Sequence, residues 1–529
     1  MSNNPKLKVK IFNSFQVQGL TLRRESSQYL EQILGRLEPD QQVDWINQII
    51  TWLQGQCLES ALISKDQIVA CIKQCSSISE QQQQVFHIIS AFDVPAFSYN
   101  NDRKKFMRIE GKRQLFPVAD AKAELYCERY KIVQQRTLRH KLFAAPTAAS
   151  MLSSSKRDHY KLCSCESLIG MTNKANRFVV VLGMLTQLKE GKLFLEDPTG
   201  SVQLDLSKAS FSQALITEGS IVLAEGTYDD KMFNVQAIGF APAEPAKTSR
   251  EYFGSVNYFA GDAVKCMKTD SSLKESQHQL EDYMLVILSD VWLDDVKTME
   301  RLKILFTGYN QCSPSAFILM GNFLRNSLGF QDVGTLKECF KQLADLITQF
   351  PDLMSRSRFI FVPGNRDPLT TKVIPRPPLP KVVTEYFSMK IPQSTFTSNP
   401  ARIQLYTQEI ILFREDLISK MCRNSVHVPW EPDGEVQLSQ LYVKNLVGNA
   451  HLCALPTHIA PVLWQWDHAL WLYPTPDLVV CADKHEPFTI SQNECLFTNP
   501  GQFTKGDFCF KVYLPGQKKV EDSQICEPE

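Results

Sequence analysis

Residues 358–368, RFIFVPGNRDP, pass from an apolar run directly into a polar turn. Aliphatic and aromatic residues without polar interruption are typical of a strand that is buried on both faces. The strand ends at Pro363, and the turn Gly-Asn-Arg-Asp (364–367) follows it. Ligand sites in α/β sheets lie at the carboxyl ends of strands, so this turn is a candidate functional site.

Three further apolar runs end in the same way. They are YMLVIL (283–288), AFILM (316–320) and LVVCA (478–482). The polar clusters that follow them are Ser289-Asp290-Val291-Trp292, Gly321-Asn322-Phe323 and Ala482-Asp483-Lys484-His485. Amphipathic helical patterns lie between the runs, so the sequence predicts an α/β domain with helices on the faces of its sheets. We expect its four polar strand tips to lie close together.

In this order, the tips resemble the motifs of the calcineurin-like metallophosphoesterase superfamily, an α/β sandwich with a two-metal site. Asp290 keeps the first acid of that pattern. Trp292 stands where the family has a histidine ligand, and Asn322 stands where it has the metal-bridging aspartate. The resemblance therefore covers the order of the motifs but not all of their ligands.

The later motifs depart from the pattern too. Asn365 is kept, whereas Arg366 replaces the catalytic histidine. Asp483 replaces the first histidine of the last motif, and His485 keeps the second. The family's isolated histidine has three candidates, none with the expected neighbours: His451, His458 and His468.

These replacements act against metal binding. Tryptophan offers only an N–H donor, and asparagine in place of aspartate removes a negative charge between the two cations. Arg366 adds a permanent positive charge and cannot serve as a proton donor near neutral pH. We therefore expect a degenerate site with no catalytic, cofactor-binding or metal-binding residues. A mononuclear site at Asp290, Asn365, Asp483 and His485 stays open. We predict that the Arg366 guanidinium fills the space that a metal would occupy and pairs with a nearby acid such as Asp290 or Asp483.

The rest of the chain divides by its patterns. Residues 1–75 carry helical periodicity and predict a small bundle that serves as a docking module. Residues 76–165 form a mixed connector with a basic segment and a Ser/Ala-rich linker. Residues 166–250 carry short alternating strands, and the turn at Asp197-Pro-Thr-Gly200 resembles that of an OB-fold β-barrel. Residues 270–529 form the phosphoesterase-like domain.

The basic segment covers residues 100–141. It holds twelve Lys/Arg and five Asp/Glu, a net charge of +7, with Phe106, Tyr126 and Tyr130 interleaved. This pattern fits contact with nucleic acid or with an acidic partner, and it also fits a solvated connector. Whether this segment or the barrel touches DNA stays open.

The composition of the chain disfavours several other classes of function. The 529 residues carry 57 basic and 57 acidic side chains, so the whole chain has little to attract DNA by itself. The 15 cysteines include no Cys-x-x-Cys pair, which disfavours a structural zinc site. No apolar run approaches the roughly 18 residues of a membrane span. We expect a soluble intracellular protein with no membrane partner.

Taken together, the modules resemble the B-subunit family of replicative DNA polymerases, of the epsilon type. The residues that carry this resemblance are LEDPTGSVQLDL (195–206), VLAEGTYDD (222–230), LSDVWLDD (288–295), FREDLISKMCRN (413–424), HLCALP (451–456), YPTPDLVVCADKHEPF (473–488) and TNPGQF (498–503).

The resemblance implies a non-catalytic nuclear scaffold in chromosomal DNA replication. The implied partners are the cysteine-rich C-terminal module of a catalytic subunit, smaller polymerase subunits and components of the replicative helicase, with DNA reached mainly through the complex. Two other functions stay open: an active metal-dependent nuclease or phosphoesterase, and a stand-alone single-stranded DNA-binding OB protein.

Overall fold

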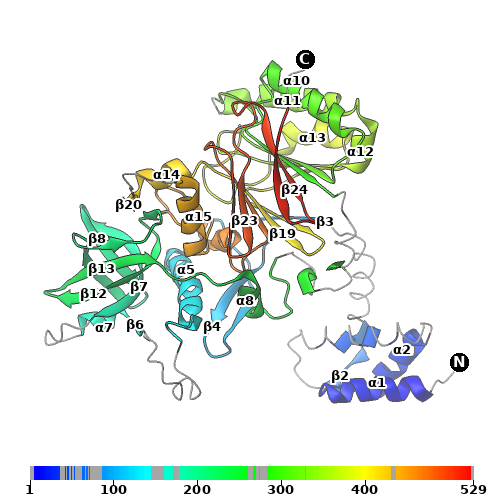
Figure 1. Cartoon of the computed structure of the whole chain (residues 1–529). Helices are drawn as coiled ribbons and strands as arrows, with labels where there is room; N and C mark the ends of the chain where they lie inside the picture. Colours follow the sequence, from blue (N-terminus) through cyan, green and yellow to red (C-terminus); the bar gives the residue numbers. More distant parts are fainter. Residues whose placement is uncertain are drawn as a thin grey trace. The chain divides into compact units, whose positions relative to one another are not determined.

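The computed structural model forms two compact units, residues 1–85 with 262–264, and residues 86–261 with 265–529 (Figure 1). It describes residues 5–35, single positions and short pieces between 42 and 71, and then 86–144, 160–170, 178–259, 266–269, 273–274, 283–327, 329–429 and 437–525.

The first unit contains the helices α1 (Pro5–Val17) and α2 (Arg24–Leu34) and a parallel pair of two-residue strands, β1 (Thr21–Leu22) and β2 (Leu62–Ile63). Leu30 and Leu34 are fully buried, as their helical spacing predicts, and they share one apolar cluster with the buried Ile11. Side chains of Ser64 and Gln67 bond reciprocally to each other's backbone N–H groups, which is a capping box. Leu37, Val43 and Ile72, which belong to the apolar helical pattern of residues 1–75, lie outside the described residues.

An OB barrel forms part of the other unit. Its five main strands are β7 (Val179–Lys189), β8 (Lys192–Asp197), β9 (Gly200–Asp205), β12 (Ile221–Asp229) and β13 (Met232–Phe240). Antiparallel pairing runs β9-β8-β7-β12-β13, and a parallel pairing of β13 with β9 closes the barrel. The Asp197 carboxylate accepts the backbone N–H groups of Thr199 and Gly200 and so fixes the predicted turn. Phe233 is fully buried inside the barrel.

Two six-stranded sheets build the domain that follows. The first has the order β17 (Ser394–Phe396), β16 (Arg358–Val362), β15 (Ala316–Met320), β14 (Leu285–Ser289), β24 (Cys509–Leu514), β25 (Lys519–Gln524). The second has the order β22 (Phe488–Gln492), β23 (Cys495–Asn499), β21 (Leu478–Ala482), β19 (Gln408–Arg414), β18 (Ala401–Leu405), β3 (Phe86–Ser90). Every residue of β14, β15 and β21 is buried, as expected for strands covered on both faces.

Helices cover the outer faces of both sheets. The first sheet packs its Phe-rich face on α10 (Val296–Tyr309), α11 (Val333–Ile347) and α13 (Lys381–Lys390). The second packs on α15 (Leu438–Asn449) and on the 3-10 helix η3 (Trp464–Leu470). Strands β16 and β19 are in contact across the two sheets.

The second unit also contains short elements outside these sheets and helices. They are β6 (Leu162–Cys163), α7 (Cys165–Ile169), β10 (Ser210–Phe211), β11 (Ile216–Thr217), α8 (Ala246–Glu251), η1 (Met267–Thr269), η2 (Phe330–Asp332), α12 (Pro351–Arg356), α14 (Ile418–Arg423) and β20 (Ser425–His427).

The barrel and the sandwich are joined within this unit. β11 pairs with β20, and the backbone N–H of Ile221 donates to the Asn449 side chain on α15 at 2.8 Å. Asn445 donates from the same helix to the carbonyl of Leu215 at 2.8 Å. Buried side-chain to backbone bonds of this kind hold the two domains in one orientation.

Much of the range 76–165 is integrated into this unit. β3 adds an edge strand to the second sheet, and a hairpin of β4 (Ala96–Asn100) and β5 (Lys105–Ile109) follows. Helix α5 (Asp120–Arg139) then contacts β7, α15 and η3. Its Arg129 forms a buried ion pair with Asp467 of η3, with 2.5 Å between nitrogen and oxygen. Part of the basic segment is therefore internal, whereas residues 145–159 of the predicted linker lie outside the described residues.

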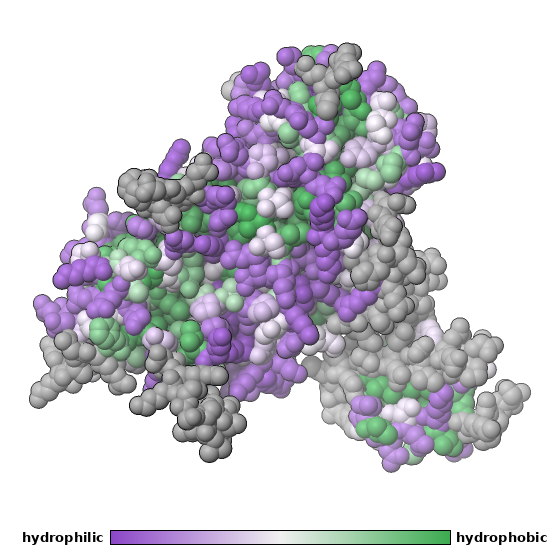
Figure 2. All heavy atoms as spheres, in the orientation of Figure 1, coloured by the Kyte–Doolittle hydropathy of each residue, from purple (hydrophilic) through white to green (hydrophobic). Residues whose placement is uncertain are grey.

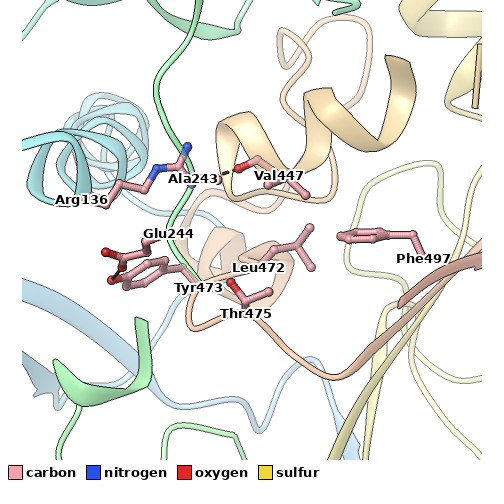
Figure 3. A pocket seen from close by; sticks show the side chains of 8 residues that line it. All are labelled: Arg136, Ala243, Glu244, Val447, Leu472, Tyr473, Thr475 and Phe497. Carbon is pink, nitrogen blue, oxygen red and sulfur yellow. Dashed lines mark hydrogen bonds between the residues drawn. The ribbon is translucent and has the colours of Figure 1, made fainter. Parts of the chain in front are cut away.

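A small cavity lies beside α5 (Figure 3). Its volume is about 10 Å³, close to the lower limit for one water molecule. The lining includes Arg136, Glu244, Val447 and Tyr473. Arg136 donates to the Val447 carbonyl at 2.9 Å, and burial lowers the pKa of its guanidinium to about 10. The cavity is thus a packing gap at the junction of the domains, too small for an organic ligand.

The visible surface of the second unit is mixed (Figure 2). Hydrophilic residues cover most of it, and hydrophobic residues reach the surface in separate areas, including one over the barrel. Among the described helices, none is both long enough and apolar enough to cross a membrane.

Candidate functional site at the strand tips

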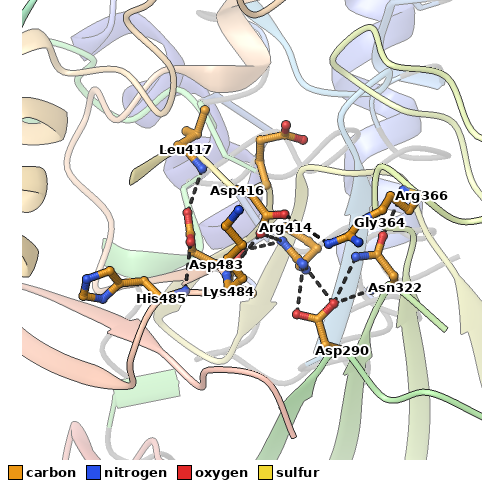
Figure 4. A network of polar contacts seen from close by, with 12 residues as sticks. Asp290, Asn322, Gly364, Arg366, Arg414, Asp416, Leu417, Asp483, Lys484 and His485 are labelled. Atoms are coloured by element: carbon orange, nitrogen blue, oxygen red, sulfur yellow. Dashed lines mark hydrogen bonds and ion pairs between the residues drawn. The ribbon is translucent and has the colours of Figure 1, made fainter. Parts of the chain in front are cut away.

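The predicted strand tips meet at one end of the two sheets (Figure 4). β14, β15 and β16 are parallel neighbours in the first sheet, so the residues after them share one edge. β21 belongs to the second sheet and lies parallel to β19. The carboxyl ends of five strands therefore contribute to the site, one more than the sequence predicts, and the additional strand is β19.

Asp290 is fully buried at the first tip. Both of its carboxylate oxygens accept hydrogen bonds from one guanidinium nitrogen of Arg414, the last residue of β19, at 2.9 Å. Asn322 donates to the same carboxylate from its backbone N–H at 3.1 Å and from its side chain at 3.0 Å. The Asp290 carboxylate therefore accepts four hydrogen bonds from protein donors, three of them at one oxygen.

Arg414 is the centre of this network. Its side chain is fully buried and donates to the carbonyls of Gly321 at 2.6 Å and Ala482 at 3.3 Å. The nitrogen that donates to Ala482 also lies 2.8 Å from the Asp416 carboxylate. Burial alone would lower the pKa of Arg414, but the charges of Asp290 and Asp416 outweigh it and raise that pKa. One guanidinium thus bridges tips from both sheets as a permanent cation.

Asp416 sits between the buried cation and the surface. Burial opposes its ionisation, but the charge and hydrogen bond of Arg414 outweigh that effect and lower the pKa of Asp416. Its carboxylate also accepts the backbone N–H of Lys484 at 3.1 Å. It is therefore a charged partner of Arg414 near neutral pH.

Arg366 lies at the rim of the site and does not fill it. Its side chain is 52% exposed, and its nearest acid partner is Asp416 at 3.7 Å. Arg366 has a nearby acid partner, as the sequence predicts, but that acid is Asp416 and not Asp290 or Asp483, because Arg414 reaches Asp290 from the opposite sheet. The backbone N–H of Arg366 donates to the Asn322 side chain at 2.9 Å, so its loop is tied to the neighbouring tip.

Asp367 closes the candidate turn of residues 364–367 and is a structural acid. Its carboxylate accepts the backbone N–H groups of Phe323 at 2.6 Å and Gly364 at 2.7 Å. Burial raises the pKa of Asp367 to about 6, although these bonds favour the ionised form. A Cβ added to Gly321 would lie 2.1 Å from an Asp367 oxygen, so glycine is required there.

Trp292 is buried at the rim between two cations. The Arg325 guanidinium and the Lys505 amine lie 5.8 and 5.3 Å from the centre of its ring system. These distances fit cation–π contacts. The side chain thus packs against positive groups where the resembled family has a metal ligand.

The side chains of Asp483 and His485 are not part of the hydrogen-bond network around Arg414. The Asp483 carboxylate accepts the backbone N–H groups of Leu417 at 2.6 Å and Ile418 at 3.0 Å, at the start of α14. Burial raises its pKa. The His485 imidazole points away from Arg414 (Figure 4). These two residues therefore anchor the last tip to a helix.

Asn365 keeps a free acceptor. Its side-chain oxygen is buried and has no hydrogen-bond partner among the described residues. Of the four residues in the predicted mononuclear site, Asp290 and Asp483 already use their oxygens for arginine, amide and backbone donors. In the part of the chain that the structure describes, no three His, Cys, Asp or Glu side chains come together as a metal-binding group.

The three candidates for the isolated histidine of the resembled family each have an environment of their own. His451 is buried with one ring nitrogen 3.3 Å from Asp467, and His468 is buried with a ring nitrogen 3.0 Å from the Val94 carbonyl. Burial, with Arg113 contributing, lowers the pKa of His468 to about 3. His458 is exposed.

The sequence does carry a signal for Arg414. Residues 409–416, EIILFRED, are an apolar run followed by polar residues, the same pattern that marks the other tips. Applying that pattern to residues 409–416 would have added a fifth tip with a basic side chain at its end.

Known proteins match the chain over almost its whole length. DNA polymerase epsilon subunit 2 of Homo sapiens is 45% identical over 525 residues, which cover 98% of this chain and 99% of the human protein. The chain belongs to the DNA polymerase epsilon subunit 2 family. The Drosophila melanogaster member is 36% identical over 98% of both chains, and the B-subunit of DNA polymerase epsilon from Saccharomyces cerevisiae is 26% identical over 94% of this chain and 84% of its own length.

Three family models divide the chain. The model for the N terminus of DNA polymerases epsilon matches residues 3–75, and that for the OB-fold domain of DNA polymerase epsilon subunit 2-like proteins matches residues 119–242. The model for the B-subunit of DNA polymerases alpha and epsilon matches residues 285–490. These matches confirm the predicted resemblance and the OB fold. A solved structure described as a novel archaeal phosphodiesterase aligns with 45% of this chain and 98% of its own at 12% identity and a TM-score of 0.25, which is too low to support an argument.

Proposed function

We propose that this chain is the non-catalytic scaffold subunit of a nuclear DNA polymerase epsilon complex, and that its phosphoesterase-like domain performs no hydrolysis. The observation that carries the second part is the Asp290–Arg414 pair. A buried guanidinium bonded to both oxygens of the first acid places a fixed positive charge where a divalent cation would need negative ligands. Membership of the DNA polymerase epsilon subunit 2 family supports the first part.

The proposed division of labour follows the four parts of the chain. Residues 1–75 form a helical docking module, and residues 76–165 connect it to the OB-fold of residues 166–250. The degenerate calcineurin-like domain of residues 270–529 completes the scaffold. Its partners are the cysteine-rich C-terminal module of the catalytic subunit, the smaller subunits and components of the replicative helicase. DNA is reached through the complex.

The metal in such an assembly belongs to the partner. The free cysteines of the described part are spread over both units and form no disulfide. Buried ones such as Cys165, Cys453 and Cys481 have their pKa values raised by burial, which keeps the thiols protonated and unsuited to bind zinc.

The test is coexpression of the full chain with the C-terminal region of the catalytic subunit, followed by metal analysis. We expect a stoichiometric complex that contains metal, and a free chain that does not. Hydrolysis of a phosphodiester by the free chain with Mn²⁺, lost in Asp290→Ala, would instead establish an enzyme. A chain that elutes quantitatively alone from the coexpression would refute the scaffold role.

A further inference from the structure

The basic segment of residues 100–141 separates into an internal and an external set of charges. Arg129 and Arg136 are 4% exposed, and Arg139 pairs with Glu244 at 2.8 Å. These three arginines hold α5 to the rest of the unit. The external set lies in the β4–β5 hairpin and the loop after it, and consists of Arg103, Lys104, Lys105, Arg108, Lys112 and the half-buried Arg113.

The external charges are not neutralised by the chain itself. Residues 101–119 hold six Lys/Arg and two Asp/Glu, a net charge of +4. None of the six forms an ion pair with a described residue. Burial and the like charge of Arg108 lower the pKa of Arg113, so these cations destabilise one another. A partner that carries negative charge would relieve this repulsion.

The same segment exposes apolar side chains. Phe116 is 93% exposed, Val118 73% and Leu115 59%, and Ile109 at the end of β5 is 48% exposed. The loop is nevertheless held in place, because the backbone N–H of Gln114 donates to the Gln465 side chain on η3 at 2.6 Å. A tethered loop that presents adjacent large apolar residues to solvent is typical of a protein interaction site.

The aromatic rings of the segment favour protein over nucleic acid. Binding of single strands relies on exposed aromatic rings on which bases stack. Here Phe106 is 4% exposed and stacks on Phe253 with 4.3 Å between ring centres, and Tyr130 is 8% exposed. Phe116 alone is a fully exposed ring in residues 101–119, and its exposed neighbours are aliphatic.

We propose that residues 103–118, the basic hairpin segment, are a docking site for an acidic amphipathic segment of a partner protein. The carboxylates of the partner pair with Arg108, with Lys112 and with the other exposed cations of the basic hairpin segment. Its apolar face covers Leu115, Phe116 and Val118. This site is separate from the strand tips and does not require the catalytic subunit to be the partner.

Two labelled 18-residue helical peptides test the proposal against the full chain by fluorescence anisotropy. Both carry Leu and Phe on one face, and the other face carries Glu in one peptide and Lys in the second. We expect the Glu peptide to bind and the Lys peptide not to bind. The variant Arg108→Glu/Lys112→Glu should weaken binding at least about tenfold, and Phe116→Ser about tenfold, which corresponds to roughly 1.4 kcal/mol.

Matched variants on another surface control for general effects. Lys303→Glu/Lys337→Glu makes the same charge change at exposed positions of α10 and α11, and Phe330→Ser removes a ring that is 80% exposed. We expect both to leave binding unchanged. The proposal is overturned if the Glu peptide does not bind, if both peptides bind equally, or if the hairpin variants behave like the controls. Binding of a 20-nucleotide oligo(dT) that is lost in the hairpin variants would also overturn it, in favour of nucleic acid.

Discussion

Replacing Arg414 with glutamine tests whether this side chain holds the strand tips together. The substitution leaves Asp290 fully buried with only the two Asn322 donors. It also removes donors from the carbonyls of Gly321 and Ala482 and the cation beside Asp416. Breaking a buried ion pair by removing one partner costs about 3–5 kcal/mol. We expect a loss of about 4 kcal/mol in the free energy of unfolding.

The assay is thermal unfolding of the purified full chain. A domain of this size shifts its Tm by roughly 2–4 °C per kcal/mol, so Arg414→Gln should lower the Tm by roughly 8–16 °C. Arg366→Gln is the matched control, because that side chain is 52% exposed and lies 3.7 Å from Asp416. Exposed pairs contribute at most about 1 kcal/mol, so the control should lower the Tm by no more than about 4 °C.

A double variant separates loss of the pair from loss of packing. Asp290 has a φ of +51°, which asparagine tolerates better than other residues, so Asp290→Asn is the suitable partner change. Asp290→Asn/Arg414→Met leaves no unpaired charge at position 290, and its cost should be less than the sum of the costs of Asp290→Asn and Arg414→Met measured separately. The reasoning is refuted if the two costs add, or if Arg366→Gln destabilises the chain as much as Arg414→Gln.

Three further predictions concern other residues of this unit. Burial raises the pKa of Asp367 from 3.8 to about 6, so the stabilising contribution of this residue is full below about pH 4 and is lost as the pH rises through 6. In urea unfolding, the difference in the free energy of unfolding between the wild type and Asp367→Asn should therefore shrink by up to about 3 kcal/mol between pH 4 and 7. A difference that stays constant over this pH range would contradict the prediction. Gly321→Ala places a Cβ 2.1 Å from the Asp367 carboxylate and should prevent stable folding. The control Gly308→Ala in α10 places its Cβ where no atom lies within 4 Å, and it should raise the free energy of unfolding by up to about 1 kcal/mol. Equal Tm values for the two variants would count against the close contact at Gly321. Arg129→Ala leaves Asp467 buried without its cation and should cost about 3–5 kcal/mol with faster hydrogen exchange in α5; unchanged exchange there would show that the pair does not hold the helix.

The elements that were predictable from the sequence are those whose signal is local. The strands of the barrel alternate, and their turn at Asp197 carries its own hydrogen-bond acceptor. The strands before Asp290, Asn322 and Asn365 are continuous apolar runs with polar ends. Each of these features is encoded within about ten residues, so no knowledge of distant pairing is required.

The features that were missed depend on pairing between distant parts of the chain. Arg414 reaches Asp290, 124 positions away, from the other sheet, so its role is visible only once both sheets are placed. The sequence points instead to the nearer Arg366, because that residue follows a strand with a clear apolar pattern. β3 pairs with β18, more than 300 positions later, so its membership of the second sheet has no local signal either. In the basic segment, the same residue types serve burial in α5 and exposure in the hairpin, and only the fold separates them.

The contacts of Arg414 support the proposal that the strand tips keep their positions without a bound metal. In a two-metal site, cations draw acids from several loops together and fix those loops. Here a single side chain makes the equivalent contacts, because its guanidinium donates to Asp290, Asp416 and the carbonyls of Gly321 and Ala482. Since arginine is part of the chain and stays charged at any physiological pH, the proposed arrangement holds the loops independently of metal supply or chelation. For the proposed scaffold role, this arrangement provides a docking surface whose shape does not vary with metal occupancy.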